Sequence, residues 1–318
     1  MERPQKIEPS EAYILIVGDI MLDEYIIGAH TRQSPEADVP VILSQEIDYR
    51  LGGAGNVAAN LNSLGISTGI ISVIGSDEKG YILKSLTKQN DIEAHFIEDN
   101  QRPTTVKQRI VNEKFEQYLR IDTEVTSDLT VSQETQIIIQ VQEQIASKKV
   151  SGIVLQDYNK GVLTDYVIKH VQEISKENKI PLFVDPKFDR FRLLSDCTVF
   201  KPNIKELSEA CGYKVKVDAV AIKKGIENLS LKADKIFVTL GAKGMYYLDN
   251  ESNTEGLAVG QSLSNADVSG AGDSVLAALI WAYIAGNSVK QMAEKANKAG
   301  AVVCSKSGVS KVNISELE

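Results

Sequence analysis

Short apolar runs alternate along this chain with longer segments of helical period, and this alternation constrains the fold more than any other feature. Runs of this kind, separated by helices, form a mostly parallel sheet whose two faces are covered by helices. We therefore predict an α/β fold. Its strands are expected at 13–17, 69–74, 152–155, 182–185 and 235–239, and helices at 53–64, 131–146 and 165–177.

Two regions, 23–48 and 94–121, interrupt the alternation, because β-branched and polar residues alternate there without a helical period. This pattern predicts antiparallel strands that form a small lid. The sequence contains no linker-like, repeated or low-complexity tract, so we expect residues 1–318 to form a single domain with the lid inserted. Ligands of an open parallel sheet bind beyond the carboxyl ends of its strands, and we expect the site there.

Composition narrows the possible functions. A net charge of -8 argues against nucleic-acid binding, which needs a basic face, but leaves small anionic substrates open. No apolar run is long enough to span a bilayer, and residues 1–10 lack the apolar core of a signal peptide. Cys197, Cys211 and Cys304 lack metal-binding spacing and fit free thiols in a reducing compartment. We expect a soluble cytoplasmic protein without a membrane or nucleic-acid partner.

The segment 265–274 is rich in glycine and small residues and runs directly into an apolar helical pattern. Gly270 and Gly272 leave backbone N–H groups at the helix start free to converge on an anion. Asp273 adds a carboxylate to the same space. A phosphate cradle with a base beside it suggests phosphoryl transfer, although the segment alone is equally consistent with a tight turn.

Two further clusters suit a polyol ligand. Asp19 ends the first predicted strand and Asp23 follows closely; such carboxylates accept hydrogen bonds from sugar hydroxyls or cap a turn. Gly52 and Gly53 precede a helix of small residues, where a ligand can approach the backbone, and Asn56 can both donate and accept. The spacing is not Gly-x-Gly-x-x-Gly, which argues against a dinucleotide-dependent oxidoreductase.

Two more clusters suit nucleotide phosphates. Asn203 and Glu206 lie three residues apart at a helix start, where they form a capping box or share a face toward a magnesium phosphate. Thr239 and Gly241 follow a strand, and Thr239 with nearby N–H groups can contact a phosphate. A plain turn between two strands would look the same.

In this order the clusters resemble the ribokinase-like, or PfkB, family of carbohydrate kinases. The match spans nearly the whole chain, and the pairing of 52–56 with 267–273 is its most specific part. The segments 18–23, 34–41, 157–161 and 185–187 resemble the kinases of this family that phosphorylate D-glycero-β-D-manno-heptose 7-phosphate at its anomeric hydroxyl, in lipopolysaccharide precursor synthesis. The resemblance implies a ribokinase-like three-layer α/β/α fold, with ATP and Mg²⁺ as cofactors.

The resemblance also implies residue roles. Asp273 would be the catalytic base, and the backbone of Gly270, Ala271 and Gly272 the anion hole. The sugar would be held by Asp19, Asp23, Gly52, Gly53 and Asn56. ATP and its magnesium would be contacted by Asn203, Ile204, Lys205, Glu206, Thr239 and Gly241, with Glu206 at the metal. A sugar hydroxyl is a poor nucleophile, so a carboxylate that accepts its proton suits this chemistry.

A phosphate on the substrate would require basic partners. The candidates are Lys107, Arg109, Lys160, Lys187, Arg190 and Arg192, each equally consistent with a surface charge. Gln33 and Asp38 replace the Ile and Pro of the heptose kinase pattern, so a kinase for another sugar, sugar phosphate or nucleoside is an alternative. A non-catalytic sugar or nucleotide sensor is a second one.

Exposed edges of lid strands are liabilities unless covered, which predicts a homodimer in which the lids pair. Many heptose kinases of this type are fused to a nucleotidyltransferase with a His-x-Gly-His motif. Because this sequence contains no such motif, we expect it to perform the kinase step alone.

Overall fold

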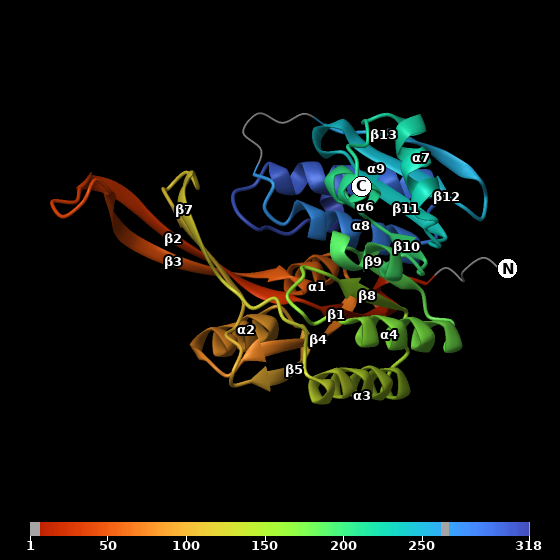
Figure 1. Ribbon diagram of the computed structural model, residues 1–318, viewed down its shortest axis with the longest axis horizontal. Helices are drawn as coiled ribbons and strands as arrows, with labels where there is room; N and C mark the ends of the chain where they lie inside the picture. Colours follow the sequence, from red (N-terminus) through yellow and green to blue (C-terminus); the bar gives the residue numbers. More distant parts are fainter. Residues whose placement is uncertain (1–6, 262–266, 318) are drawn as a thin grey trace.

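The computed structural model describes residues 7–261 and 267–317. Its main feature is a nine-stranded sheet in the order β13-β12-β11-β10-β9-β8-β1-β4-β5 (Figure 1). The pairs from β11 to β5 are parallel, whereas β12 and β13 pair antiparallel at one edge. The strands are β1 (Tyr13–Gly18), β4 (Ser67–Gly75), β5 (Glu93–Asp99), β8 (Gly152–Gln156), β9 (Leu182–Asp185), β10 (Val199–Phe200), β11 (Lys235–Thr239), β12 (Gly244–Asp249) and β13 (Thr254–Val259).

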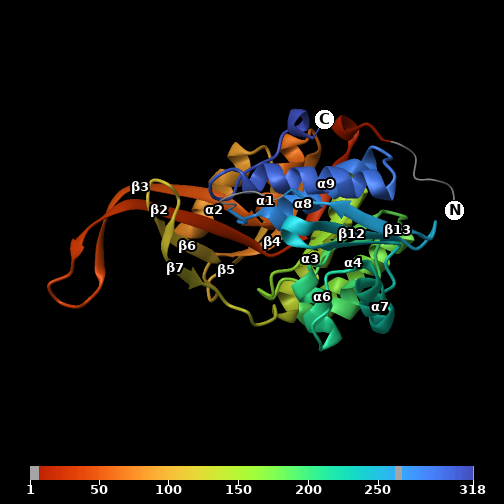
Figure 2. The same ribbon diagram turned by 90° about the horizontal axis from the view of Figure 1, so that it is seen from above.

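Helices cover both faces of the sheet, which gives the fold three layers (Figure 2). One apolar core joins the sheet to α1 (Ala54–Ser63), α8 (Ala271–Ile284) and α9 (Val289–Cys304). A second core joins the opposite face to α3 (Val131–Ser147), α4 (Asp165–Glu177), α6 (Ile204–Cys211) and α7 (Ala219–Leu229). Helix α2 (Glu78–Gln89) packs beside β4 and β5. The predicted α/β fold with a mostly parallel sheet is confirmed.

The hydrophobic pattern of each helix explains its layer. Helix α4 buries Val167, Ile168, Val171 and Ile174, which share one face at helical spacing, so it lies on the surface of the sheet. Helix α8 is buried nearly all round, because it packs against both α1 and α9 as well as the sheet. A helix that is apolar on every side needs such surroundings. The buried body of α8 thereby fixes the position of its N-terminus, where Gly270 and Ala271 are partly exposed and Gly272 is exposed.

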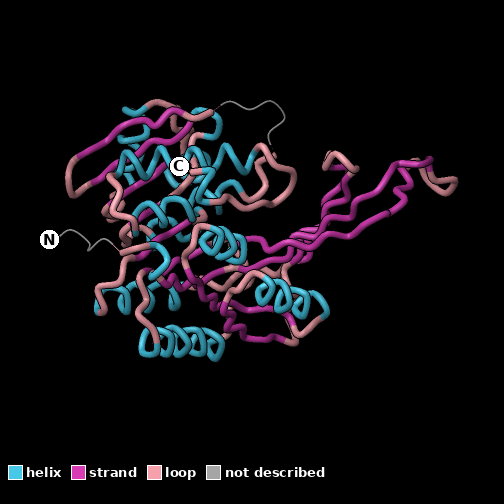
Figure 3. The backbone as a smooth tube through the Cα atoms, turned by 180° about the vertical axis from the view of Figure 1, so that it is seen from behind, coloured by secondary structure: helices cyan, strands magenta, loops and turns pink. Residues whose placement is uncertain are grey.

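A second, four-stranded sheet projects from the body of the molecule (Figure 3). Its order is β3-β2-β6-β7, with β2 (Ile20–Gln33), β3 (Pro40–Gly53), β6 (Val106–Val111) and β7 (Gln117–Thr123). The β2–β3 and β6–β7 pairs are antiparallel hairpins, as predicted, but β2 and β6 pair in parallel. The outer strands β3 and β7 leave two free edges within the described chain.

The lid range predicted at 94–121 is wrong at its beginning. Residues Glu93–Asp99 form β5, which pairs in parallel with β4 at the edge of the central sheet. An edge strand is covered only in part, so its residue pattern resembles that of an exposed lid strand. The other range, 23–48, is too short, because β2 and β3 reach back to Ile20 and on to Gly53.

Within the described residues, no helix has both the length and the apolar character needed to cross a bilayer. All three cysteines are free thiols, which confirms the prediction that they are unpaired. Cys197 is buried, while Cys211 and Cys304 are half-buried.

Candidate active site

Four buried polar side chains follow adjacent strands at the carboxyl edge of the central sheet. Asp19 follows β1, Gln156 ends β8, Asp185 ends β9 and Lys201 follows β10. Because these four strands are neighbours in the sheet, their ends form one continuous row. This is the place predicted for a ligand site in an open parallel sheet.

Helix α8 brings the second glycine-rich segment to the same region. Gly270 is its N-cap and has a left-handed φ of 72°, which favours glycine. A Cβ on Gly270 would also meet Nδ2 of Asn56 at 2.5 Å, so the two glycine-rich segments touch here. The first residues of the predicted segment, Asn265 and Ala266, lie outside the described residues.

The first turn of α8 presents N–H groups and the positive end of the helix dipole. The N–H of Ala271 donates to the carbonyl of Val268 at 3.2 Å, so it already takes part in a turn. Gly272 and Asp273 follow in the first turn, where an α-helix offers no internal acceptor to N–H groups. The ammonium of Lys201 lies 3.8 Å from where a Cβ on Gly272 would be. An anion at this helix start would therefore also meet a buried cation.

The carboxylate of Asp273 is buried, with 2% of the residue exposed, and three side chains donate to it. Oδ2 accepts from Nδ2 of Asn56 at 2.8 Å. Oδ1 accepts from the hydroxyl of Tyr158 at 2.7 Å and from Nε2 of Gln156 at 3.2 Å. These donors come from α1, from the loop after β8 and from the end of β8.

Burial raises the pKa of Asp273 to about 7, although the hydrogen bonds from Asn56 and Tyr158 oppose this rise. The nearby carboxylate of Asp185 also raises this pKa, and Lys201 lowers it. Asp185 and Lys201 form a buried ion pair at 2.9 Å. A carboxyl group with a pKa near neutrality is suited to accept a proton from a hydroxyl.

Asp19 holds a backbone loop in this structure. Only 1% of Asp19 is exposed, and its carboxylate accepts the N–H groups of Tyr158, Lys160 and Val162 at 2.8, 3.0 and 3.2 Å. Both oxygens are engaged, which leaves less capacity for sugar hydroxyls than the sequence suggested. Asp19 thereby fixes the loop that carries Tyr158.

Asp23 lies on β2 and forms an ion pair with Arg109 of β6. Burial raises the pKa of Asp23, and the charge of Arg109 opposes this effect. Gly52 lies on the neighbouring strand β3, paired with Met21, and a Cβ there would clash with Oδ2 of Asp23. At Gly53, with a φ of 57°, a Cβ would clash with the carbonyl of Asp19. The protein's own atoms therefore explain both glycines, where the sequence suggested close approach of a ligand.

The capping box predicted at the start of α6 is present. Oδ1 of Asn203 accepts the N–H groups of Lys205 and Glu206 at 2.9 Å, and Glu206 in turn accepts the N–H of Asn203 at 2.8 Å. The second carboxylate oxygen of Glu206 pairs with Lys187 at 2.5 Å. Ile204 begins the helix behind this cap.

Thr239 and Gly241 lie beside this cap. The N–H of Thr239 donates to the carbonyl of Pro202 at 3.0 Å, and Thr239 forms an isolated β-bridge with Asn203. Gly241 has a φ of 60°, and no atom of the described residues lies within 4 Å of where its Cβ would be. Open space beside a left-handed glycine allows a ligand to approach the backbone.

Lys187 links the cluster around Asp273, through the ring of Tyr158, to the cap of α6 at Glu206. Its ammonium pairs with Glu206 and lies 5.1 Å from the centroid of the Tyr158 ring. Although burial lowers the pKa of Lys187, the carboxylates of Asp185 and Glu206 raise it above its usual value. Lys187 and Arg109 are both candidates for binding a substrate phosphate, and in this structure they pair with different carboxylates, Glu206 and Asp23.

Lys107 also lies near Tyr158, with its ammonium 5.9 Å from the ring centroid. Burial lowers its pKa, an effect that the charge of Asp122 opposes. Among the residues that the structure describes, no carboxylate forms an ion pair with it. Lys107 is therefore a half-buried cation at the edge of the site with capacity for an anion.

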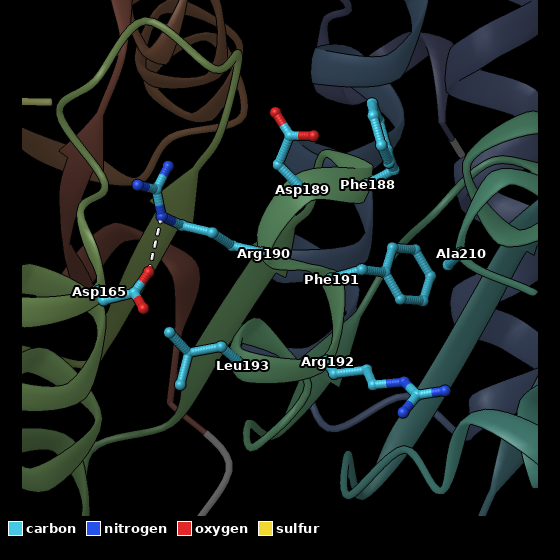
Figure 4. Close-up of a pocket in the computed structure, with 8 residues that line it drawn as sticks. All are labelled: Asp165, Phe188, Asp189, Arg190, Phe191, Arg192, Leu193 and Ala210. Atoms are coloured by element: carbon cyan, nitrogen blue, oxygen red, sulfur yellow. Dashed lines mark hydrogen bonds and ion pairs between the residues drawn. The ribbon is translucent and has the colours of Figure 1, made fainter. Parts of the chain in front are cut away.

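Arg190 and Arg192 lie elsewhere, at a surface pocket formed by the segment after β9 (Figure 4). Arg190 pairs with Asp165 at 2.9 Å and with Asp128 at 2.7 Å, so its charge is neutralised. Lys160 pairs with Glu124 at 2.8 Å. The pocket includes neither Asp273 nor Asp19.

Sequence reasoning assigned no role to Gln156, Tyr158, Asp185 or Lys201, although Tyr158 and Asp185 lie within segments that carried the resemblance. For Gln156, Tyr158 and Asp185 the available signal was position, because each one ends or follows a predicted buried strand. In a parallel sheet such residues meet at one edge, and applying that rule would have found these three. Lys201 follows β10, a two-residue strand that was not predicted, so this signal was missing for it.

The pfkB family carbohydrate kinase pattern matches residues 11–316. The chain belongs to this family. The bifunctional protein HldE of a Nitratiruptor species is 37% identical over 306 residues, which cover 96% of this chain and 64% of that protein. HldE of Haemophilus influenzae (strain PittEE) is 34% identical over 98% of this chain and 64% of its own length. This carbohydrate kinase thus spans slightly less than two-thirds of the length of these curated relatives.

Solved structures share the fold of this carbohydrate kinase. Phosphofructokinase-2 from Escherichia coli in complex with potassium superposes with a TM-score of 0.79 and 22% identity, over 96% of both chains. The same enzyme in complex with fructose-6-phosphate superposes with a TM-score of 0.77 and 22% identity, again over 96% of both chains. The predicted ribokinase-like fold and membership of the PfkB family are confirmed.

Proposed function

We propose that this ATP-dependent sugar kinase phosphorylates D-glycero-β-D-manno-heptose 7-phosphate at O1, giving the 1,7-bisphosphate used in lipopolysaccharide heptose synthesis in the cytoplasm. The observation that carries the catalytic part is Asp273, a buried carboxylate with a pKa of about 7 at the start of α8. The choice of heptose rests on the resemblance of segments 18–23, 34–41, 157–161 and 185–187 and is supported by the HldE relatives.

In the proposed reaction, Asp273 accepts the proton of the attacking hydroxyl as its oxygen forms a bond to the γ-phosphorus of ATP. The bond from that phosphorus to the bridging oxygen breaks, and ADP leaves. The free N–H groups of Gly272 and Asp273 would stabilise charge on the transferring group, as donors aimed at developing charge do. The ammonium of Lys201, close to Gly272, would add to that stabilisation.

The nucleotide would lie along the ends of β10 and β11, beside Asn203, Thr239 and Gly241. No group of three or more potential metal ligands occurs in the described part of the chain. Mg²⁺ fits these residues nonetheless, because it binds ATP phosphates and water with only one or two carboxylates. Glu206 would hold it, and the bound ion would shield the phosphate charge.

Lys107 is the candidate for the phosphate that the sugar already carries. Of the three phosphate-binding candidates that lie near the site, Arg109 is paired with Asp23 and Lys187 with Glu206. Lys107 has no such partner among the described residues, and an incoming phosphate would compensate its burial. This arrangement supports a phosphorylated acceptor over ribose or a nucleoside.

The two departures from the heptose kinase pattern, Gln33 and Asp38, are exposed where β2 ends and the loop to β3 follows (Figure 3). They belong to the projecting hairpin, whereas Asp273 is buried in the body. Their side chains therefore do not weaken the assignment of the residues around Asp273.

Release of ADP from Mg-ATP across a panel of acceptors tests the proposal. The panel holds the heptose 7-phosphate, sedoheptulose 7-phosphate, fructose phosphates, ribose and adenosine. We expect selective turnover of the heptose phosphate, and Lys107→Met should raise its KM while Lys290→Met, at an exposed helical position, should not. Selective turnover of another sugar would rule out the heptose phosphate as the substrate. Absence of turnover with every acceptor would favour a non-catalytic sensor.

A further inference from the structure

We infer that Tyr158 is a positioning residue that fixes Oδ1 of Asp273 through its hydroxyl, so that Oδ2 is the oxygen that receives the proton of the acceptor. This inference deepens the proposed function and rests on Asp273 being the base. The relevant geometry is the distribution of donors over the two carboxylate oxygens.

The two oxygens of Asp273 differ in their remaining capacity. Oδ1 accepts from both Tyr158, at 2.7 Å, and Gln156, at 3.2 Å, and a carboxylate oxygen offers about two lone-pair directions. Among the described residues, Oδ2 accepts from Asn56 alone, at 2.8 Å. A substrate hydroxyl therefore finds its acceptor on Oδ2.

The position of Tyr158 is set by its own loop. Its backbone N–H donates to Asp19 at 2.8 Å, and the carboxylate of Asp157 accepts the N–H groups of Asn159 and Lys187 at 2.8 and 3.2 Å. The ring lies against Gly53, where a Cβ would approach it within 3.5 Å. These contacts hold the hydroxyl in place before any ligand arrives.

The charges around the phenol keep it a donor. Burial and the carboxylate of Asp273 raise the pKa of Tyr158 well above its usual value, so it stays protonated over the working range. The titratable and charged groups that face the Tyr158–Asp273 pair are Asp23, Lys107, Asp185, Lys187 and Lys201. Loss of the phenol hydroxyl would leave these groups unchanged and remove one donor from Oδ1.

The test is Tyr158→Phe, which keeps the ring and removes the hydroxyl. Loss of a hydrogen bond to the charged carboxylate should lower kcat about 10- to 100-fold. It should also raise the pKa of Asp273, which moves the acid limb of the pH profile up by about one pH unit. The KM for ATP should not change. The matched control is Tyr246→Phe. Tyr246 lies on β12, remote from the site, and the variant removes a hydroxyl that donates to Glu255 at 2.8 Å.

Replacement of Tyr158 by 3-fluorotyrosine, a stronger donor, should move the acid limb the opposite way, which a purely structural role would not do. Titration of ¹³C-labelled aspartate by NMR, with the Asp273 signal assigned by its loss in Asp273→Asn, gives the same pKa without turnover. It therefore separates failure of this inference from failure of the proposed reaction. An unchanged Asp273 titration in Tyr158→Phe, or faster turnover in that variant, would overturn the inference.

Discussion

Nδ2 of Asn56 lies 2.8 Å from Oδ2 of Asp273, which joins two helix starts that are 217 residues apart in the sequence. The contact exists because α1 packs against α8 and the first turns of the two helices meet. Gly270 permits it, since any side chain there would occupy the place of the Asn56 amide. The two glycine-rich segments of the sequence are thus halves of one structure around a buried carboxylate.

The pH dependence of the reaction should follow Asp273. A base must be deprotonated, so kcat/KM should rise with pH through an apparent pKa of about 7. The folded-state pKa is above the ordinary value of 3.8, so this group stabilises the folded protein less as pH rises from about 4 to about 7. Measured rates between pH 5 and 9 check the first statement; a flat profile over that range would contradict it.

Asp19→Asn should lower stability as well as activity. The asparagine keeps one acceptor oxygen where the carboxylate accepts three N–H groups, so we expect a loss of about 1–3 kcal/mol in the free energy of unfolding. Urea denaturation measures it. Asp218→Asn at the N-cap of α7 is the control, because asparagine caps helices equally well. Unchanged stability with a raised KM for sugar would instead support direct sugar binding by Asp19.

Glu206→Gln should raise the Mg²⁺ concentration needed for half-maximal rate. The neutral amide keeps the capping geometry but no longer attracts the cation or balances Lys187. Initial rates against free Mg²⁺ at fixed ATP test this. Glu209→Gln, on the same helix and paired with the exposed Lys205 at 3.7 Å, should leave the Mg²⁺ dependence unchanged. Equal responses of the two variants would remove Glu206 from the metal site.

The small sheet should mediate a homodimer. It has two free edges, and it exposes apolar side chains that include Leu43, Ile47 and Leu119. Light scattering at micromolar concentration should give twice the chain mass, and Leu43→Arg should shift the protein toward monomer. Val220→Arg, at an exposed position on α7, is the control. A monomeric native protein would contradict the prediction.

Much of the fold is legible in the sequence because buried strands and amphipathic helices have distinct periods. The predicted helix at 165–177 coincides with α4, whose buried face repeats at helical spacing. The strand Glu93–Asp99 was misassigned, because a partly covered edge strand has no pattern that separates it from a lid strand. Only its pairing with β4 decides the matter.

The sequence allowed several residues of the site to be predicted, but few of the contacts between them. The sequence identified Asn56 and Asp273, and the structure brings them together. It did not reveal that the Asp19 carboxylate is engaged by backbone N–H groups, since such contacts depend on the path of a loop. Nor did it reveal Tyr158, whose role depends on its distance from a carboxylate 115 residues away.

The most direct test is kcat of Asp273→Asn with the best acceptor of the panel. We expect it to fall about 10²- to 10⁴-fold, the range for loss of a general base, with little change in ATP affinity. The control is Asp249→Asn. Asp249 is a buried aspartate that ends β12 beside the start of β11, at the edge of the sheet away from Thr239, and its variant should keep native kcat. Turnover of Asp273→Asn within a few fold of the native rate would contradict the assignment of Asp273 as the base and, with it, the mechanism proposed for this kinase.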